Sequence, residues 1–159
     1  MPTKKHTIEF DVDGLPPKKD GAKSMWGKDE QIKRLLALRK QAVAVMPEDK
    51  VFCSDISLCI KIFVAKESLH ERHCGDLDNF ITGICDGLMA ATPKAVRYHR
   101  IKWQEHVGKA THLTETIAID DDSKVTSISA TKNAKENNEK DHYHIVICGH
   151  LKDKDSDAH

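Results

Sequence analysis

A group of acidic and amide side chains lies in the stretch CGDLDNFITGICDGL, residues 74–88. Asp76, Asp78 and Asn79 stand at the start of an apolar segment with helical spacing, and Asp86 follows two turns further along. A surface helix needs only one such side chain as its N-terminal cap. The group is therefore either a helix cap with more polar side chains than a cap requires, or a set of ligands for a cation.

Asp76 and Asp78 are two residues apart, and in an extended lead-in to the helix their side chains would point to the same side, roughly 6–7 Å apart along the chain. Two carboxylates at close range repel each other by about 1–4 kcal/mol, depending on the local dielectric. A cation removes that repulsion, and oxygen ligands without histidine or cysteine favour Mg²⁺ or Mn²⁺. The spacing is compatible with such a metal site and with a plain helix cap.

A second acidic group, Asp120, Asp121 and Asp122, leads directly into a strand pattern that begins at Val125. If the preceding helix docks on the sheet, the two groups could meet around one metal ion, or around two ions about 3.5–4 Å apart, an arrangement that hydrolyses phosphodiesters. The alternative is a solvated turn. Which of the three acids would be the ligand stays open.

Hydrophobic periodicity predicts six elements in the order strand, helix, strand, helix, strand, strand. The predicted strands cover residues 8–12, 51–65, 125–130 and 143–147, and the predicted helices cover residues 29–46 and 79–89. This order predicts an α/β fold, with one small mixed β-sheet packed against two main helices on one face or both. A polar run at residues 133–141 predicts an open hairpin connection between the last two strands.

Two glycines, Gly83 and Gly87, lie four residues apart inside the second predicted helix. Each costs about 1 kcal/mol there relative to alanine. The pair leaves a flat strip on the helix, which predicts the close approach of a sheet or another helix, or of a second copy of the chain.

The composition is that of an ordinary folded domain, with 39% apolar and 31% charged residues in a chain of 159. Because 25 basic residues balance 25 acidic ones, nucleic-acid binding would have to depend on local patches. No apolar run reaches the roughly 18 residues of a membrane span, and the first residues lack the apolar core of a signal peptide. We therefore expect no membrane partner and a cytoplasmic location. The 5 cysteines are interpreted as reduced thiols.

Residues 75–88 and the sequence DDSKV at residues 121–125 resemble the pattern of the RusA family of Holliday junction resolvases. The shared features are Asp-x-Asp-Asn, then Asp-x-Leu, then an Asp-Asp pair before a strand. The order of elements is also similar over most of residues 7–149. The resemblance implies a Mg²⁺- or Mn²⁺-dependent endodeoxyribonuclease that cleaves four-way DNA junctions in recombination and repair, and that acts as a homodimer.

Position by position, the resemblance implies that the catalytic metal-binding acids are Asp76, Asp78 and Asp122. Asp121 is a further candidate ligand beside Asp122. Asp86 also matches, as a supporting residue, and so does Asn79.

One departure from the family concerns Thr82, which stands where the family usually has a catalytic lysine. Thr82 should project from the same helix face as Asp78 and Asp86. Either another cation, such as Lys124 or Lys102, reaches the site, or activity is weak or lost. The alternative function is therefore a DNA-structure-binding protein of the same fold that does not cleave. An unrelated α/β scaffold is a third reading.

A second departure is an insert at about residues 89–118, which mixes basic and aromatic residues. It is either a DNA-contacting arm or an amphipathic surface segment. The basic residues predicted to contact nucleic acid, in the insert and elsewhere, are Lys18, Lys19, Lys23, Arg97, Arg100, Lys102 and Lys124.

Two smaller expectations concern a zinc site and the extent of the domain. His70, His73 and Cys74 could suggest zinc, but the second ligand pair of a structural zinc site is missing. We expect residues 1–150 to form the RusA-like domain and residues 151–159 to form a disordered charged tail.

Overall fold

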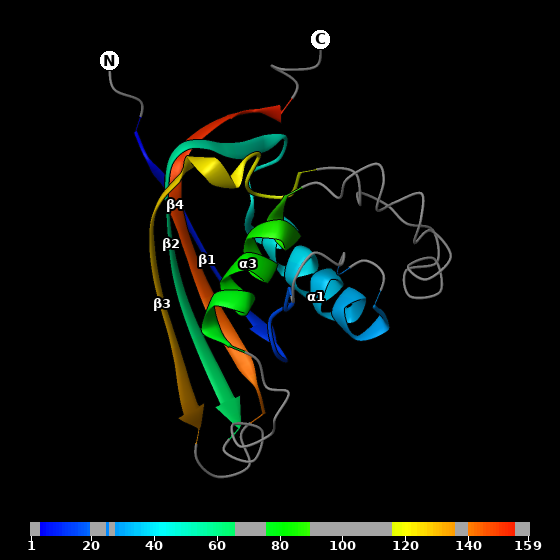
Figure 1. Ribbon diagram of the computed structural model, residues 1–159. Helices are drawn as coiled ribbons and strands as arrows, with labels where there is room; N and C mark the ends of the chain where they lie inside the picture. Colours follow the sequence, from blue (N-terminus) through cyan, green and yellow to red (C-terminus); the bar gives the residue numbers. More distant parts are fainter. Residues whose placement is uncertain are drawn as a thin grey trace.

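The computed structural model describes residues 4–19, 25, 28–65, 76–89, 116–135 and 140–154. In this part of the chain, both α-helices lie on one face of a four-stranded mixed sheet (Figure 1). The elements are β1 (His6–Asp13), α1 (Asp29–Val45), β2 (Lys50–Ala65), α3 (Leu77–Leu88), the short 3-10 helix η2 (Asp122–Lys124), β3 (Val125–Lys135) and β4 (His142–Asp153). The predicted α/β class and the predicted order of elements are confirmed.

The strands follow each other across the sheet in the order β1-β4-β2-β3. β4 pairs antiparallel with β1 and β2, whereas β3 pairs parallel with β2 at the edge. The predicted hairpin between β3 and β4 is therefore wrong. The inner face of β4 carries large buried residues such as Tyr143 and Ile145, which suit a central position, whereas Ile128 on β3 is 45% exposed.

β2, α3 and β3 form a βαβ unit, because α3 connects two parallel strands. α3 runs back along the sheet against the direction of these strands (Figure 1). Its N-terminus therefore lies towards the carboxyl end of β2, and its C-terminus lies towards the amino end of β3.

The hydrophobic core fills the space between the sheet and the two helices. β2 buries every second side chain from Ile56 to Val64, as a strand with one covered face does. The helices contribute apolar side chains at helical spacing, namely Ile32, Leu35, Leu38 and Ala42 from α1 and Phe80, Ile84 and Leu88 from α3.

The boundary predicted at residue 150 is too early. β4 continues to Asp153, and its last residues pair with the start of β2, with Leu151 opposite Phe52 and Lys152 opposite Val51. These residues stay ordered because the start of the long strand β2 offers them a pairing partner. Residues 155–159 lie outside the described residues.

Two features expected from the composition concern membrane-spanning helices and the cysteines. No helix among them is long and apolar enough to cross a membrane. Cys53, Cys59, Cys85 and Cys148 are free thiols. Cys74 lies outside the described residues, as do His70 and His73.

Candidate acidic site around helix α3

The first acidic group lies at the N-terminal end of α3. Asp76 is the N-cap residue, but its side chain makes no capping hydrogen bond. Asp78 lies in the first turn, where a negative charge interacts favourably with the helix dipole. Both residues are exposed, and in the described part of the chain neither carboxylate has a hydrogen-bond or ion-pair partner. Because the helix already starts at Leu77, the extended spacing predicted for this pair does not apply to Asp78.

The chain that leads to the second acidic group is fixed at the C-terminal end of α3. The carbonyl oxygen of Leu88 accepts hydrogen bonds from three successive backbone N–H groups, those of Ile117 (3.2 Å), Ala118 (3.0 Å) and Ile119 (3.3 Å). The buried side chain of Arg39 donates to the carbonyl oxygens of Gly87 at 3.0 Å and Met89 at 2.7 Å. These contacts satisfy the free carbonyl groups of the helix end and bring Asp120 next to it.

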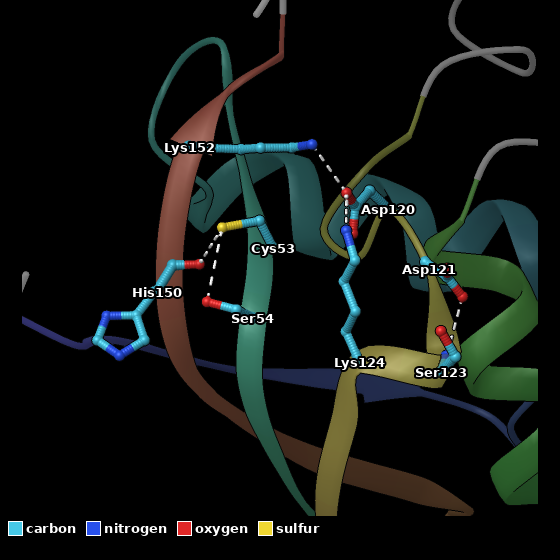
Figure 2. Close-up of polar contacts among 8 residues, drawn as sticks. All are labelled: Cys53, Ser54, Asp120, Asp121, Ser123, Lys124, His150 and Lys152. Atoms are coloured by element: carbon cyan, nitrogen blue, oxygen red, sulfur yellow. Dashed lines mark hydrogen bonds and ion pairs between the residues drawn. The ribbon is translucent and has the colours of Figure 1, made fainter. Parts of the chain in front are cut away.

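Asp120 is engaged by two lysines. Its Oδ2 lies 3.0 Å from Nζ of Lys124 and 3.0 Å from Nζ of Lys152 (Figure 2). Its Oδ1 is buried and has no hydrogen-bond partner among the described residues. A metal ion at Asp120 would compete with both ammonium groups. Lys124, which was predicted to contact nucleic acid or to replace the missing lysine, is one of these two lysines.

Asp121 and Asp122 differ in whether their carboxylates have a partner. Oδ1 of Asp121 accepts a hydrogen bond from the backbone N–H of Ser123 at 2.9 Å, and this bond lowers the pKa of the Asp121 carboxyl (Figure 2). Asp122 is exposed, and its carboxylate has no hydrogen-bond or ion-pair partner among the residues that the structure describes. Of the three acids, Asp122 is therefore the one whose carboxylate is not already engaged.

The two acidic groups lie towards opposite ends of α3. Asp122 follows the segment bonded to Leu88 at the C-terminal end of α3, whereas Asp78 lies in the first turn of this helix. Burial, together with the negative charges of Asp122 and Asp86, raises the pKa of the Cys85 thiol to about 11. Across the described ranges, no three His, Cys, Asp or Glu side chains are grouped closely enough to hold a metal ion.

The donor chemistry still suits a hard cation at the N-terminal end of α3. Mg²⁺ usually takes one or two carboxylates from a protein and completes its coordination with water and substrate phosphates. Asp76 and Asp78 would supply two such carboxylates without breaking an ion pair. The predicted site in which Asp76, Asp78 and Asp122 bind one ion is not assembled among the described residues, because Asp122 follows the segment bonded to the other end of α3.

Thr82 and Asp86 occupy the exposed side of α3 between the two acidic groups. The hydroxyl of Thr82 donates to the backbone carbonyl of Asp78 at 3.0 Å, an ordinary helix contact. Asp86 is paired, because its Oδ2 lies 2.9 Å from Nζ of Lys19. Lys19 was predicted to contact DNA, but its position against α3 was not predicted, because Lys19 and Asp86 are 67 positions apart in the sequence.

The other predicted nucleic-acid contacts are only partly described. The backbone N–H of Lys18 donates to the side chain of the buried residue Gln31 at 2.7 Å. Most of the insert at about residues 89–118 lies outside the described residues. The predicted contacts that fall outside them are Lys23, Arg97, Arg100 and Lys102.

We compared the chain with known protein families and with curated proteins. No match was found. The resemblance to the RusA family therefore stays a prediction, carried by the motif residues and by the order of elements.

Proposed function

We propose that the protein is a metal-dependent endodeoxyribonuclease that cleaves four-way DNA junctions. The observation that carries the proposal is the pair Asp76 and Asp78, two exposed carboxylates without a side-chain partner among the described residues. They lie towards the carboxyl end of β2, within a parallel βαβ unit. In open α/β sheets, ligands bind outside the carboxyl ends of parallel strands, and β2–β3 is the parallel pair of this sheet.

In this proposal Asp76 and Asp78 bind Mg²⁺ or Mn²⁺, and Asp122, at the other end of α3, does not share their ion. A bound ion would supply Lewis-acid chemistry for phosphodiester hydrolysis. The protein's own contribution is to keep these carboxylates exposed and free of ion pairs, while neighbouring acids are neutralised by Lys124, Lys152 and Lys19.

The proposed substrate has two-fold symmetry and requires paired cuts. A homodimer with one site in each subunit would match that symmetry. With 25 basic and 25 acidic residues, the chain would have to bind DNA through local basic groups rather than through net charge. A cytoplasmic location belongs to the same proposal.

One observation favours a second candidate, a protein of the same fold that binds branched DNA without cutting it. Thr82 contributes a hydroxyl rather than an ammonium group to the exposed side of α3, and that hydroxyl is already bonded to a backbone carbonyl. In addition, the described residues do not gather three acidic ligands in one place.

A nicking assay on a synthetic four-way junction separates the two candidates. The nuclease predicts paired cuts with Mg²⁺ or Mn²⁺ and no cuts with EDTA. Junction binding without cutting in either metal would reject the nuclease in favour of the second candidate. Binding that shows no preference for the junction over a linear duplex competitor would reject both.

A further inference from the structure

The segment of residues 15–19 is held firmly against α1. The side-chain oxygen of the buried residue Gln31 accepts a hydrogen bond from the backbone N–H of Lys18 at 2.7 Å. Arg34 donates to the backbone carbonyl of Pro16 at 3.4 Å. Both prolines of the segment are buried. A surface connection is thereby fixed in one conformation.

The same segment packs directly on α3. Pro17 lies so close to Gly83 that a Cβ atom at that position would stand 1.9 Å from the Pro17 carbonyl oxygen. The backbone N–H of Lys19 donates to the backbone carbonyl of Asn79 at 3.2 Å. The glycine strip predicted from the sequence is therefore covered by this segment, and at Gly87 also by leucine side chains of α1.

The side chain of Lys19 extends along the exposed side of α3. Its backbone is bonded to Asn79 in the first turn, while its Nζ lies 2.9 Å from Oδ2 of Asp86. Asn79 and Asp86 are seven residues apart, or about 10 Å along the helix axis. The ammonium group therefore lies at the level of the helix turn that follows Thr82. The Lys19 side chain is 34% exposed, so solvent and ligands can reach it.

Without Lys19, this side of α3 would repel DNA. Asp78 and Asp86 lie on the helix, Asp76 is its N-cap residue, and Asp122 follows the segment bonded to its C-terminal end. Neighbouring carboxylates oppose the approach of a phosphate group. In the part of the chain that the structure describes, Lys19 pairs with an aspartate on α3 itself, whereas Lys124 and Lys152 pair with Asp120.

We infer, on the basis of the proposed function, that Lys19 is the residue that binds the DNA phosphate at the acidic site. In the free protein Asp86 holds the ammonium group in place. In the complex the phosphate takes the place of Asp86 as its partner. Because the 15–19 segment is already docked, little backbone freedom is lost when the contact forms.

Two substitutions that break the same ion pair test this inference. Lys19→Met should lower junction affinity on the order of tenfold, the loss of one charged hydrogen bond, and should reduce the salt slope of binding by about 1. Asp86→Asn keeps the lysine and removes its competing partner, so junction affinity should rise. Both affinities are measured in EDTA, where no cutting occurs. An ion pair with only a structural role would change affinity in the same direction in both variants.

Two further variants serve as the control and the rescue. Lys61 is exposed on β2, on the sheet face opposite to the helices, so Lys61→Met should leave affinity and salt slope unchanged. Thr82→Lys in the Lys19→Met background places an ammonium group on the same side of α3 and should restore most of the lost affinity. If the Lys19→Met variant binds the junction with the same affinity as the Lys61→Met variant, the inference is overturned.

Failure of the inference and failure of the proposed function give different results. A wild-type protein that cuts, together with Lys19→Met that binds normally, rejects the role of Lys19 alone. A wild-type protein that binds junctions without cutting rejects the nuclease, and the binding series then decides on Lys19. A wild-type protein without junction preference rejects both.

Discussion

At the scale of single residues, the aspartates around α3 fall into two classes. Asp120 is held by two lysines and Asp86 by one, while Asp121 caps η2 through a backbone N–H. Three others, Asp76, Asp78 and Asp122, are exposed and have no such partner within the described ranges. Engaged carboxylates stabilise the fold, whereas unengaged ones are available to a cation at no structural cost.

Tyr143 gives a prediction about stability. Its hydroxyl is buried without a hydrogen-bond partner among the described residues, and burial raises the pKa of this phenol. An unpaired buried hydroxyl costs free energy, so Tyr143→Phe should leave the free energy of unfolding unchanged or raise it by up to about 1 kcal/mol. Urea unfolding measures the difference. A loss of stability of that size would contradict the unpaired state of the hydroxyl.

Cys85 gives a prediction about pH. Its pKa is raised from 9.0 to about 11 in the folded protein, so the unfolded chain loses this proton first as the pH rises. The stability associated with the neutral thiol is complete below pH 9.0 and is lost as the pH approaches about 11. Alkylation of Cys85, followed by mass spectrometry across this range, reports the pKa in the native protein.

The same measurement tests whether η2 lies beside α3. Asp122→Asn removes a negative charge close to the thiol and should lower the pKa of Cys85. Asp13→Asn, on the opposite edge strand β1, should leave it unchanged. Equal alkylation profiles for wild type and Asp122→Asn would show that the two elements are not neighbours.

At the scale of elements, the packing of the 15–19 segment on α3 gives a prediction about the two glycines. In Gly83→Ala the new Cβ meets backbone atoms of Pro17 at 1.9 and 2.5 Å, so the whole segment has to move. We expect a loss of about 1–3 kcal/mol in the free energy of unfolding, as in other overpacked sites. In Gly87→Ala the nearest atoms are the ends of leucine side chains, at 2.8 and 3.1 Å, which can rotate away.

Gly87→Ala should therefore cost less than Gly83→Ala, because alanine also gains about 1 kcal/mol in helix propensity over glycine. Chemical unfolding of the two variants beside wild type measures both values. If Gly83→Ala proved as stable as Gly87→Ala, the close contact between Pro17 and α3 would be refuted.

The elements themselves were predictable because each one buries a single stripe of apolar side chains. Ile8, Phe10 and Val12 alternate as a strand requires, and Ile32, Leu35 and Leu38 follow a helical period. The pairing of the strands was not predictable in this way, because apolar alternation does not specify the neighbour. The parallel pair β2–β3 was therefore missed and a β3–β4 hairpin was expected in its place.

This missed pairing has a direct consequence for the candidate site. In a βαβ unit, the residues before the helix and the residues before the second strand lie at opposite ends of the helix. Asp76 and Asp122 were expected to meet if the helix docked on the sheet. The helix does dock, but the parallel pair β2–β3 places the two residues towards opposite ends of α3. Gln31, Arg34 and Arg39 were also missed, because polar residues on an amphipathic helix carry no signal of the backbone carbonyl or N–H that they will bind.

At the scale of the whole molecule, the balance of charge is achieved by local pairing. Lys5 pairs with Asp55, Lys19 with Asp86, and Lys124 and Lys152 with Asp120. On β4, His144 contacts Asp11 at 2.8 Å and Glu9 at 3.2 Å. Asp76, Asp78 and Asp122 near α3 are exposed acids without such a partner in the described part of the chain. With a net charge of zero, DNA binding requires that basic and acidic side chains gather on different parts of the surface.

The proposed nuclease depends most directly on the carboxylate of Asp78, and Asp29 provides a matched control. Each lies in the first turn of its helix, so Asp78→Asn and Asp29→Asn should each cost about 0.3–1 kcal/mol of helix-dipole stabilisation. Only Asp78 lies in the candidate site. The decisive measurement is the rate of junction cutting with Mg²⁺ for wild type and both variants, beside junction affinity in EDTA.

We predict that Asp78→Asn binds the junction normally but cuts it on the order of 10²–10³ times more slowly, whereas Asp29→Asn cuts like wild type. Equal cutting rates for Asp78→Asn and Asp29→Asn would contradict the proposed role of the acidic site on α3.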